Sequence, residues 1–206
     1  MAIVLSGTAL SAEIATIRDR SSTIDVFRSA VYRIGLHLAV ETSRHLPSRE
    51  IHVTTPIETT VGEVIDGNVI VVPILRAGLG LLDPFLKICP NVTVGFIGLK
   101  RNEETLKPTE YYRNLPPSDS STTFIVIDPM LATGGSMTAT LALIRELPHR
   151  KIIAACLISA PEGIGRIAQD HPDVLIITAA LDRQLNNDGY IVPGLGDAGD
   201  RLFGTL

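Results

Sequence analysis

The sequence predicts an α/β fold in which a parallel sheet is flanked by helices. Five apolar runs of strand length recur from residue 69 onward, and helix-compatible segments separate several of them. Strands that are apolar at every position, rather than at alternate positions, are typical of parallel sheets buried on both faces. The expected strands are residues 69–75, 92–99, 124–127, 152–158 and 174–178, and the expected helices are residues 81–88, 137–147 and 163–170.

Residues 1–68 come before this alternation and predict a long helix followed by an exposed arm. Residues 22–25 match a capping box with Asp25 in the Glu position. Apolar side chains then recur at helical spacing as far as Leu46, and Pro47 ends the helix. Residues 51–58 alternate loosely and are rich in Thr, which indicates an exposed strand or arm.

Two polar stretches interrupt or follow the predicted sheet. Residues 100–121 are charged, contain proline and show no periodicity, so we expect a long loop that is functional or disordered. Residues 181–206 are rich in Gly and Asp, and they form either a hood over the edge of the sheet or a loose tail. The chain is expected to be a single domain, 1–206, with its core sheet in residues 69–180.

Composition favours an enzyme without a nucleic-acid or membrane partner. The formal net charge is −4 and the basic residues form no cluster, so non-specific binding to nucleic acid is not expected. Residues 1–10 lack the cationic start of a signal peptide, and no apolar run reaches membrane-spanning length. We therefore expect a cytoplasmic protein in which Cys89 and Cys156 are reduced structural thiols.

Residues 124–136 carry the clearest chemical signal. They read FIVIDPMLATGGS, which is an apolar strand, Asp128 at its end, a turn of small residues and the start of a helix. Glycines let the main chain approach a phosphate, and the N–H groups at a helix start bind it. An acid beside such a cradle suits sugar hydroxyls or a metal-bound water. The pattern therefore predicts a phosphorylated sugar as the ligand.

Two better-known phosphate-binding motifs are excluded. A P-loop requires a lysine after its last glycine, whereas Ser136 follows Gly135 in this chain. The letters GLGDAG at residues 194–199 match the dinucleotide fingerprint, but they follow Pro193 and leave no room for a helix and a second strand. We interpret that match as coincidental.

Residues 128–136 resemble the ribose-phosphate motif of the type I phosphoribosyltransferases, and the Pro-Met-Leu-Ala after the acid resembles the uracil phosphoribosyltransferase branch of that family. Three further segments are similar to that branch and occur in the same order. They are residues 73–80 (PILRAGLG), 101–105 (RNEET) and 189–200 (GYIVPGLGDAGD). The likeness runs from about residue 69 to residue 205. Pro129 stands where many type I relatives carry a second acid, and this departure fits the uracil branch.

The resemblance implies a site for 5-phosphoribosyl 1-pyrophosphate. Ala132 to Ser136 would hold the 5′-phosphate and Asp128 the ribose hydroxyls. Arg76 would hold the pyrophosphate next to a non-proline cis peptide, and Arg101 would reach it when the polar loop closes as a lid. From the residues alone, Arg76 is also consistent with a surface arginine paired with an acid. Arg101 is also consistent with a charged side chain exposed to solvent. The implied contacts are Arg76, Arg101, Asp128, Pro129, Met130, Leu131, Ala132, Thr133, Gly134, Gly135, Ser136 and Asp197.

The segment from Tyr190 to Gly199 is implied to hold the base. Main-chain groups of Ile191, Gly196 and Ala198 would contact uracil, because small residues let the main chain come close. Asp197 would lie beside the sugar pyrophosphate through magnesium-bound water, or would help to remove the uracil N1 proton, and both roles stay open. Mg²⁺ is implied as a cofactor held by substrate phosphates and water rather than directly by the protein. The implied catalytic residues are Asp197, Arg76 and Arg101.

The activity implied by the resemblance is pyrimidine salvage, in which uracil and 5-phosphoribosyl 1-pyrophosphate give UMP and pyrophosphate. Three alternatives stay open: transfer to another base, a regulatory RNA-binding protein on the same fold, and a nucleotide sensor without turnover. The resemblance also implies a homodimer or homotetramer, for which the exposed arm is a pairing element. GTP is a candidate effector, although no motif assigns it a site.

Overall fold

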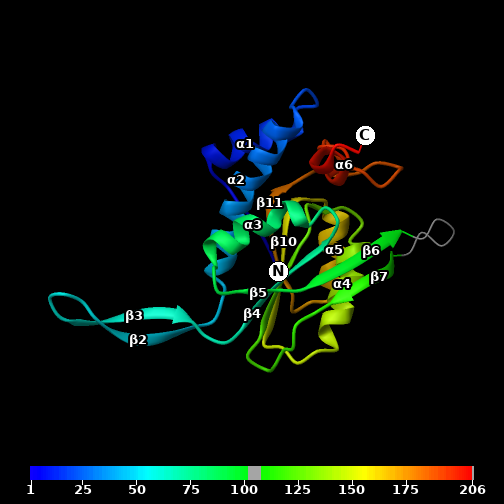
Figure 1. Ribbon diagram of the computed structural model, residues 1–206. Helices are drawn as coiled ribbons and strands as arrows, with labels where there is room; N and C mark the ends of the chain where they lie inside the picture. The colour runs from blue at the N-terminus through cyan, green and yellow to red at the C-terminus, as the bar shows by residue number, and fades with distance from the viewer. Residues whose placement is uncertain (102–107, 206) are drawn as a thin grey trace.

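The computed structural model describes residues 1–101 and 108–205, and it confirms an α/β fold around one mixed, mostly parallel sheet (Figure 1). The order along the sheet is β1-β11-β10-β8-β4-β6-β7, and every pairing is parallel except that of β6 with β7. These strands are β1 (Ala2–Val4), β11 (Leu175–Leu181), β10 (Lys151–Ser159), β8 (Thr123–Ile127), β4 (Val69–Leu75), β6 (Phe96–Arg101) and β7 (Pro108–Asn114). The short strands β5 (Thr93–Val94) and β9 (Met130–Leu131) pair with β4 and β10.

Helices cover both faces of this sheet at its centre, which is why the central strands β4, β8 and β10 are buried and largely apolar on both faces. Val69 and Val71 of β4 pack with α1 (Thr8–Arg18), α2 (Ile24–Ser43) and α3 (Leu79–Ile88). The alternate residues Ile70 and Val72 pack on the other face with α4 (Gly135–Arg145) and α5 (Pro161–Asp170). Cys89 and Cys156 are buried free thiols, as expected.

The N-terminal part differs from the expectation in three ways. The edge strand β1 has only three residues and was not predicted, and helix α1, of 11 residues, precedes the one long helix for which the sequence analysis proposed bounds. The N-cap of α2 is Thr23 rather than Ser22, and the Thr23 hydroxyl donates to Asp25 at 2.5 Å. The arm is a hairpin of β2 (Ser48–Thr54) and β3 (Thr59–Ile65) that projects from the body in Figure 1, so the predicted strand at residues 51–58 straddles its tip.

The prediction of a long loop at residues 100–121 is wrong for much of its length. Strand β7 pairs antiparallel with β6 and extends the sheet at its edge. Its residues are polar because the strand is largely exposed, so periodicity gave no signal. The expected strand 92–99 is also divided, because Gly95 separates β5 from β6.

The C-terminal residues form a hood rather than a tail. They contain β12 (Gln184–Leu185), β13 (Ile191–Val192) and α6 (Ala198–Phe203), and α6 lies beside α1 and α2 in Figure 1. Arg201 donates to the carbonyl oxygens of Ile17, Asp19 and Leu195, and its guanidinium lies 4.2 Å from the centre of the Phe27 ring. No helix among the described residues is long and apolar enough to span a membrane.

Candidate active site

The carboxyl ends of two neighbouring strands define the candidate site. Strands β4 and β8 pair in parallel with Pro73 opposite Ile127. Arg76 and Asp128 therefore follow at the same edge of the sheet, where open α/β sheets bind their ligands. The structure brings together the two residues that the sequence placed on one rim.

The loop that carries Arg76 folds back against this edge. The Leu75–Arg76 peptide bond is cis, which confirms the expected non-proline cis peptide next to Arg76. Gly78 packs so closely that a Cβ atom there would lie 2.6 Å from the Ile127 carbonyl oxygen. A residue without a side chain is therefore needed at Gly78, a requirement that the sequence analysis did not recognise.

Arg76 and Asp197 line one pocket, although they come from distant parts of the sequence. The pocket has a volume of about 570 Å³, which is within the range of small-molecule sites. Arg76 is exposed there and has no ion-pair partner among the described side chains. Lys100 and Tyr111 of the β6–β7 hairpin also line it. Sequence reasoning missed these two because it treated their segment as a loop.

Asp128 lies at the end of β8 in a desolvated position. The residue is only partly accessible. Burial raises the pKa of its carboxyl to about 7, although the Met130 N–H that donates to it acts in the opposite direction. Burial, and secondarily the Asp128 charge, raise the pKa of the nearby Cys156 thiol. Near neutral pH, the Asp128 carboxyl can accept hydrogen bonds from hydroxyl groups as an anion or donate one as an acid.

The predicted phosphate loop leads into helix α4. Gly134 is the N-cap of α4 and has a φ of 76°, in the left-handed region that favours glycine. Thr133 is exposed, and its hydroxyl oxygen accepts a long hydrogen bond of 3.4 Å from the Gly135 N–H. The N–H groups in the first turn of a helix have no intrahelical partner, so they can bind an anion.

The residues between Asp128 and this turn are largely structural. Met130 and Leu131 form β9 beside β10, and the Pro129 carbonyl oxygen accepts two hydrogen bonds of 3.0 Å from β10. The Leu131 side chain is 1% exposed and belongs to the core, so it positions the loop and offers no surface to a ligand. Ala132 and Ser136 are half-buried on either side of the turn.

Helix α5 supports the phosphate loop through Gly163. A Cβ atom at this position would lie 2.5 Å from the Ala132 carbonyl oxygen and 2.8 Å from that of Leu131. Sequence reasoning missed Gly163. Gly163 was the first residue of the predicted helix 163–170. The observed helix begins at Pro161, so Gly163 lies inside it, where glycine costs helix stability and has a packing reason.

The hood brings the predicted base-binding residues to the same edge. A Cβ atom at Gly189 would lie 3.7 Å from Thr133 of the phosphate loop, and one at Gly199 would lie 3.7 Å from Ala77 of the Arg76 loop. Three predicted contacts lie between these points. Ile191 is buried in β13, Gly196 is exposed with a φ of 84°, and Ala198 begins α6.

Asp197 is the N-cap of α6. Its Oδ1 atom accepts a hydrogen bond of 2.9 Å from the Asp200 N–H, and the side chain is exposed at the pocket that Arg76 lines. The cap orients the carboxylate, whose oxygens are the hard donors that Mg²⁺ prefers. Within residues 1–101 and 108–205, no group of three His, Cys, Asp or Glu residues could hold a metal ion by itself. The described site thus has only two separate carboxyl groups, Asp197 and the half-buried Asp128, and no carboxylate cluster, which suits an ion carried mainly by substrate phosphates.

The predicted contact of Arg101 stays a prediction. Arg101 ends β6, and its backbone pairs with Pro108 of β7. Its side chain and residues 102–107 lie outside the described part of the chain. The described base of the β6–β7 hairpin does border the Arg76 pocket, through Lys100 and Tyr111.

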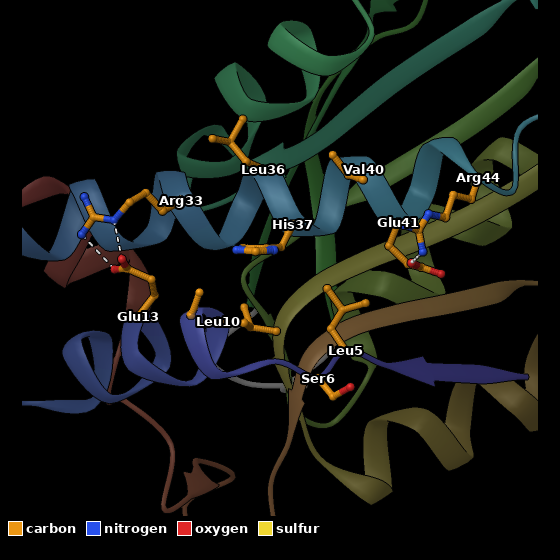
Figure 2. A pocket seen from close by; sticks show the side chains of 11 residues that line it. Leu5, Ser6, Leu10, Glu13, Arg33, Leu36, His37, Val40, Glu41 and Arg44 are labelled. Atoms are coloured by element: carbon orange, nitrogen blue, oxygen red, sulfur yellow. Dashed lines mark hydrogen bonds and ion pairs between the residues drawn. The ribbon is translucent and has the colours of Figure 1, made fainter.

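A second pocket lies between α1 and α2, away from this edge (Figure 2). Arg33 pairs with Glu13 there at 2.6 Å, and Arg44 pairs with Glu41 at 3.1 Å. Because acids of the pocket already neutralise these two arginines, the pocket is poorly suited to a phosphorylated ligand. The Arg76 pocket remains the candidate site.

Comparison with known proteins gives a consistent result over nearly the whole chain. A protein-family model described as uracil phosphoribosyltransferase matches residues 4–205. A uracil phosphoribosyltransferase of Exiguobacterium sibiricum is 51% identical over 87% of this chain and 86% of that protein. A uracil phosphoribosyltransferase of Dictyoglomus thermophilum is 45% identical over 100% of both chains.

Solved structures show the same relationship. The AQ2163 protein of Aquifex aeolicus superposes with a TM-score of 0.91, at 37% identity over 98% of each chain. A purine phosphoribosyltransferase of Pyrococcus horikoshii superposes with a TM-score of 0.51, at 16% identity over 77% of this chain and 93% of that one. The second likeness concerns the fold alone.

Proposed function

Because this chain belongs to the uracil phosphoribosyltransferase family, we propose that the site at the carboxyl edge of its sheet makes UMP and pyrophosphate from uracil and 5-phosphoribosyl 1-pyrophosphate. In this reaction the bond between the anomeric carbon and the pyrophosphate oxygen breaks, and the electron pair leaves with pyrophosphate. A bond forms between that carbon and uracil N1, whose proton is lost. The ribosyl centre gains oxocarbenium character on the way, as in glycoside cleavage.

The observation that carries the proposal is the placement of three separate segments around one edge. The Arg76 loop, the phosphate loop before α4 and the hood meet there, as the contacts of Gly199 with Ala77 and of Gly189 with Thr133 indicate. A transferase must hold both substrates in line, and such positioning supplies much of its rate enhancement.

The phosphate loop would hold the sugar phosphate. The N–H groups after Gly134 and the hydroxyls of Thr133 and Ser136 would bind the 5′-phosphate at the start of α4. Asp128 would accept hydrogen bonds from the ribose hydroxyls as an anion. Pro129 to Leu131 fix the spacing between these two groups through the pairing of β9 with β10.

Arg76 would bind the departing pyrophosphate. A guanidinium forks onto two phosphate oxygens, which a lysine cannot do. Arg101 would add a second contact from the β6–β7 hairpin. Mg²⁺, when bound through the substrate phosphates and Asp197, would neutralise the charge that develops on the leaving group. Asp197 would otherwise help to remove the N1 proton of uracil.

The base would lie against the main chain of the hood. N–H groups of the turn from Gly196 to Ala198 face a carbonyl-bearing base favourably, and they would reject cytosine, whose amino group is a donor. Ile191 would add contacts from β13. Since the main chain supplies these groups, side-chain composition alone does not reveal the specificity.

A direct assay tests the proposal. UMP formation from uracil and 5-phosphoribosyl 1-pyrophosphate is measured with and without Mg²⁺, and cytosine, hypoxanthine and orotate are compared with uracil. We expect Mg²⁺-dependent UMP formation with cytosine inert. Efficient turnover of another base, or no turnover of any, would contradict the proposed reaction.

Three expectations from the resemblance complete the proposal. A homodimer or homotetramer is tested by sedimentation at micromolar concentration, where a monomer would contradict it. GTP as an effector is tested by titration into the same assay, and an unchanged rate would remove it. A cytoplasmic location is tested by fractionation of the source cell.

A further inference from the structure

An ion pair between the half-buried Arg18 and the buried Asp182 joins helix α1 to the hood. Asp182 follows β11, and its side chain is 4% exposed. Arg18, in the last turn of α1, donates to Asp182 Oδ1 at 2.5 Å and to Oδ2 at 2.8 Å. Two hydrogen bonds in a fork geometry hold this pair in a single arrangement.

The same pair also binds the main chain of Gly194, through its N–H and its carbonyl oxygen. The Gly194 N–H donates to Asp182 Oδ2 at 2.8 Å, and the Gly194 carbonyl oxygen accepts from Arg18 at 3.0 Å. A residue whose N–H and carbonyl are both bound to charged groups has little freedom to rotate. The ion pair therefore defines the main-chain conformation at Gly194.

Gly194 controls the turn in which the proposed base contacts lie. It has a φ of 61°. Its Cα is so close to Ile191 that an added Cβ atom would lie 2.1 Å from the Ile191 carbonyl oxygen. Two residues further along, Gly196 begins the exposed part of the turn. A displacement of Gly194 would therefore move Ile191 on one side and Gly196 on the other.

An ion pair in this position is a poor way to gain stability alone. Burying two charges costs desolvation that often cancels their attraction, and an apolar pair of similar volume stabilises a protein as well or better. What the pair supplies is a defined geometry, since the Gly194 N–H and carbonyl oxygen bond to the two charged groups only when the turn is in place. Such a geometry matters to main-chain groups that must face a ligand within a fraction of an ångström.

We propose that Arg18 and Asp182 are positioning residues for uracil, which act by holding the turn from Ile191 to Ala198 in its binding conformation. The inference rests on the proposed function, because it assigns a cause to the affinity of that site for the base. Neither residue touches the reacting atoms. The pair acts on the base subsite rather than on the sugar-phosphate subsite, which the Arg76 and phosphate loops form.

The test separates these two subsites kinetically. In Asp182→Asn, the neutral amide no longer holds Arg18 and Gly194 together, so we expect the KM for uracil to rise about tenfold or more. The KM for 5-phosphoribosyl 1-pyrophosphate should change by less than about twofold, because the Arg76 and phosphate loops are untouched and Asp197 is held by its own cap bond from the Asp200 N–H. Arg18→Lys keeps the positive charge but lacks the forked guanidinium. It should also raise the KM for uracil without changing the KM for 5-phosphoribosyl 1-pyrophosphate, and the rise should be smaller than in Asp182→Asn.

Asp173→Asn is the matched control. Asp173 also pairs with an arginine, Arg145, at 2.7 Å, but that pair is exposed and contacts no part of the hood. The control should leave both KM values unchanged. If Asp182→Asn does not fold, the two KM values are compared in Arg18→Lys and in the double variant Arg18→Met with Asp182→Asn. The double variant buries no unpaired charge.

The outcomes are distinguishable. If the wild type makes no UMP, the proposed function fails before any variant is compared. If the wild type makes UMP and the variants raise the KM for both substrates alike, or for neither, the pair is merely structural and the positioning role is wrong. A rise in KM that is confined to uracil supports the positioning role.

Discussion

Among single residues, Asp128 links the stability of the protein to pH. Its carboxyl has a pKa of about 7 in the folded chain, against an ordinary value of 3.8. The folded state therefore binds a proton that the unfolded state releases between these two values. The stability contributed by protonated Asp128 is complete below about pH 4 and is lost as the pH rises through about 7.

Asp128→Asn should remove this dependence. The amide is neutral at every pH, and it can still accept from the Met130 N–H. We expect the variant to exceed the wild type in free energy of unfolding by about 2 kcal/mol at pH 8, with the difference vanishing towards pH 4. Chemical denaturation of both proteins at several pH values measures this difference in free energy of unfolding. A difference that is constant between pH 4 and pH 8 would contradict the assigned pKa.

Arg76 should be irreplaceable in catalysis but not in folding. Arg76→Ala is expected to lower kcat/KM for 5-phosphoribosyl 1-pyrophosphate by about a hundredfold or more, because a charge-assisted fork to the leaving group is lost. Arg76→Lys should retain part of the activity. Arg150→Ala, which breaks only an exposed pair with Asp66, is the control for both. Equal activity of Arg76→Ala and the control would show that pyrophosphate binds elsewhere.

At this scale the sequence indicates candidate binding residues but not the residues that support them. Asp128 and Gly134 belong to a sequence motif that by itself predicts phosphate and sugar binding. Gly163 and Asp182 belong to no such motif, because their importance comes from contacts with distant segments. Asp182 lies in the polar stretch that was expected to form either a hood or a loose tail, and its side chain is buried against Arg18.

At the scale of elements, the contact between α5 and the phosphate loop predicts a contrast between two glycines of one helix. Gly163→Ala would place a Cβ atom 2.5 Å from the Ala132 carbonyl oxygen, whereas at Gly165 a Cβ atom would meet nothing within 4 Å. We expect Gly163→Ala to lose about 1–3 kcal/mol of stability and to weaken binding of the sugar phosphate. Gly165→Ala should gain about 0.5–1 kcal/mol.

Thermal unfolding and the KM for 5-phosphoribosyl 1-pyrophosphate measure this contrast. The two variants make the same chemical change in the same helix, so a general effect of alanine in α5 cancels between them. If both variants have similar stability and similar KM, the phosphate loop accommodates the added methyl group at Gly163 without loss of stability or binding.

The elements that could be predicted are those buried on both faces. The strands β4, β8 and β10 are apolar throughout, and their predicted bounds lie within one residue of the observed ones. Strand β7 is polar because it lies exposed at the edge of the sheet, so hydrophobic periodicity could not identify it. The hairpin of the arm was likewise seen only as one exposed strand.

For the whole molecule, the arm projects from the body and exposes apolar side chains (Figure 1). Ile57 at its tip is 93% exposed, and Val61 of β3 is 55% exposed. Apolar side chains on a projecting hairpin are typical of a surface that another chain covers. We therefore expect an assembly to hold this arm, as the proposed homodimer or homotetramer would.

Ile57→Asp combined with Val61→Asp should weaken that assembly. Two charges in an apolar interface cost several kcal/mol when unpaired, so we expect sedimentation at micromolar concentration to show a smaller species than the wild type. The arm makes few contacts with the body, and circular dichroism should show an unchanged fold. An unchanged sedimentation coefficient would mean that the arm lies outside the interface.

The arrangement of the parts was harder to predict than the parts themselves. The resemblance implied a hood, but no pattern in the sequence says that α1 holds it. The bond from Arg18 to Asp182 spans 164 residues, and that from Arg201 to Ile17 spans 184. Contacts of this range depend on the finished fold, which local patterns do not encode.

These contacts bear on the order in which the chain matures during synthesis on the ribosome. Strand β1 pairs with β11, and α1 binds the hood, so residues 2–18 find these partners only after residues 175–201 have been synthesised. Until then the guanidinium of Arg18 stays in water and the sheet keeps an open edge. We expect nascent chains that stop before β11 to leave residues 2–18 unpaired and exposed to proteases and chaperones, with the base subsite not yet formed.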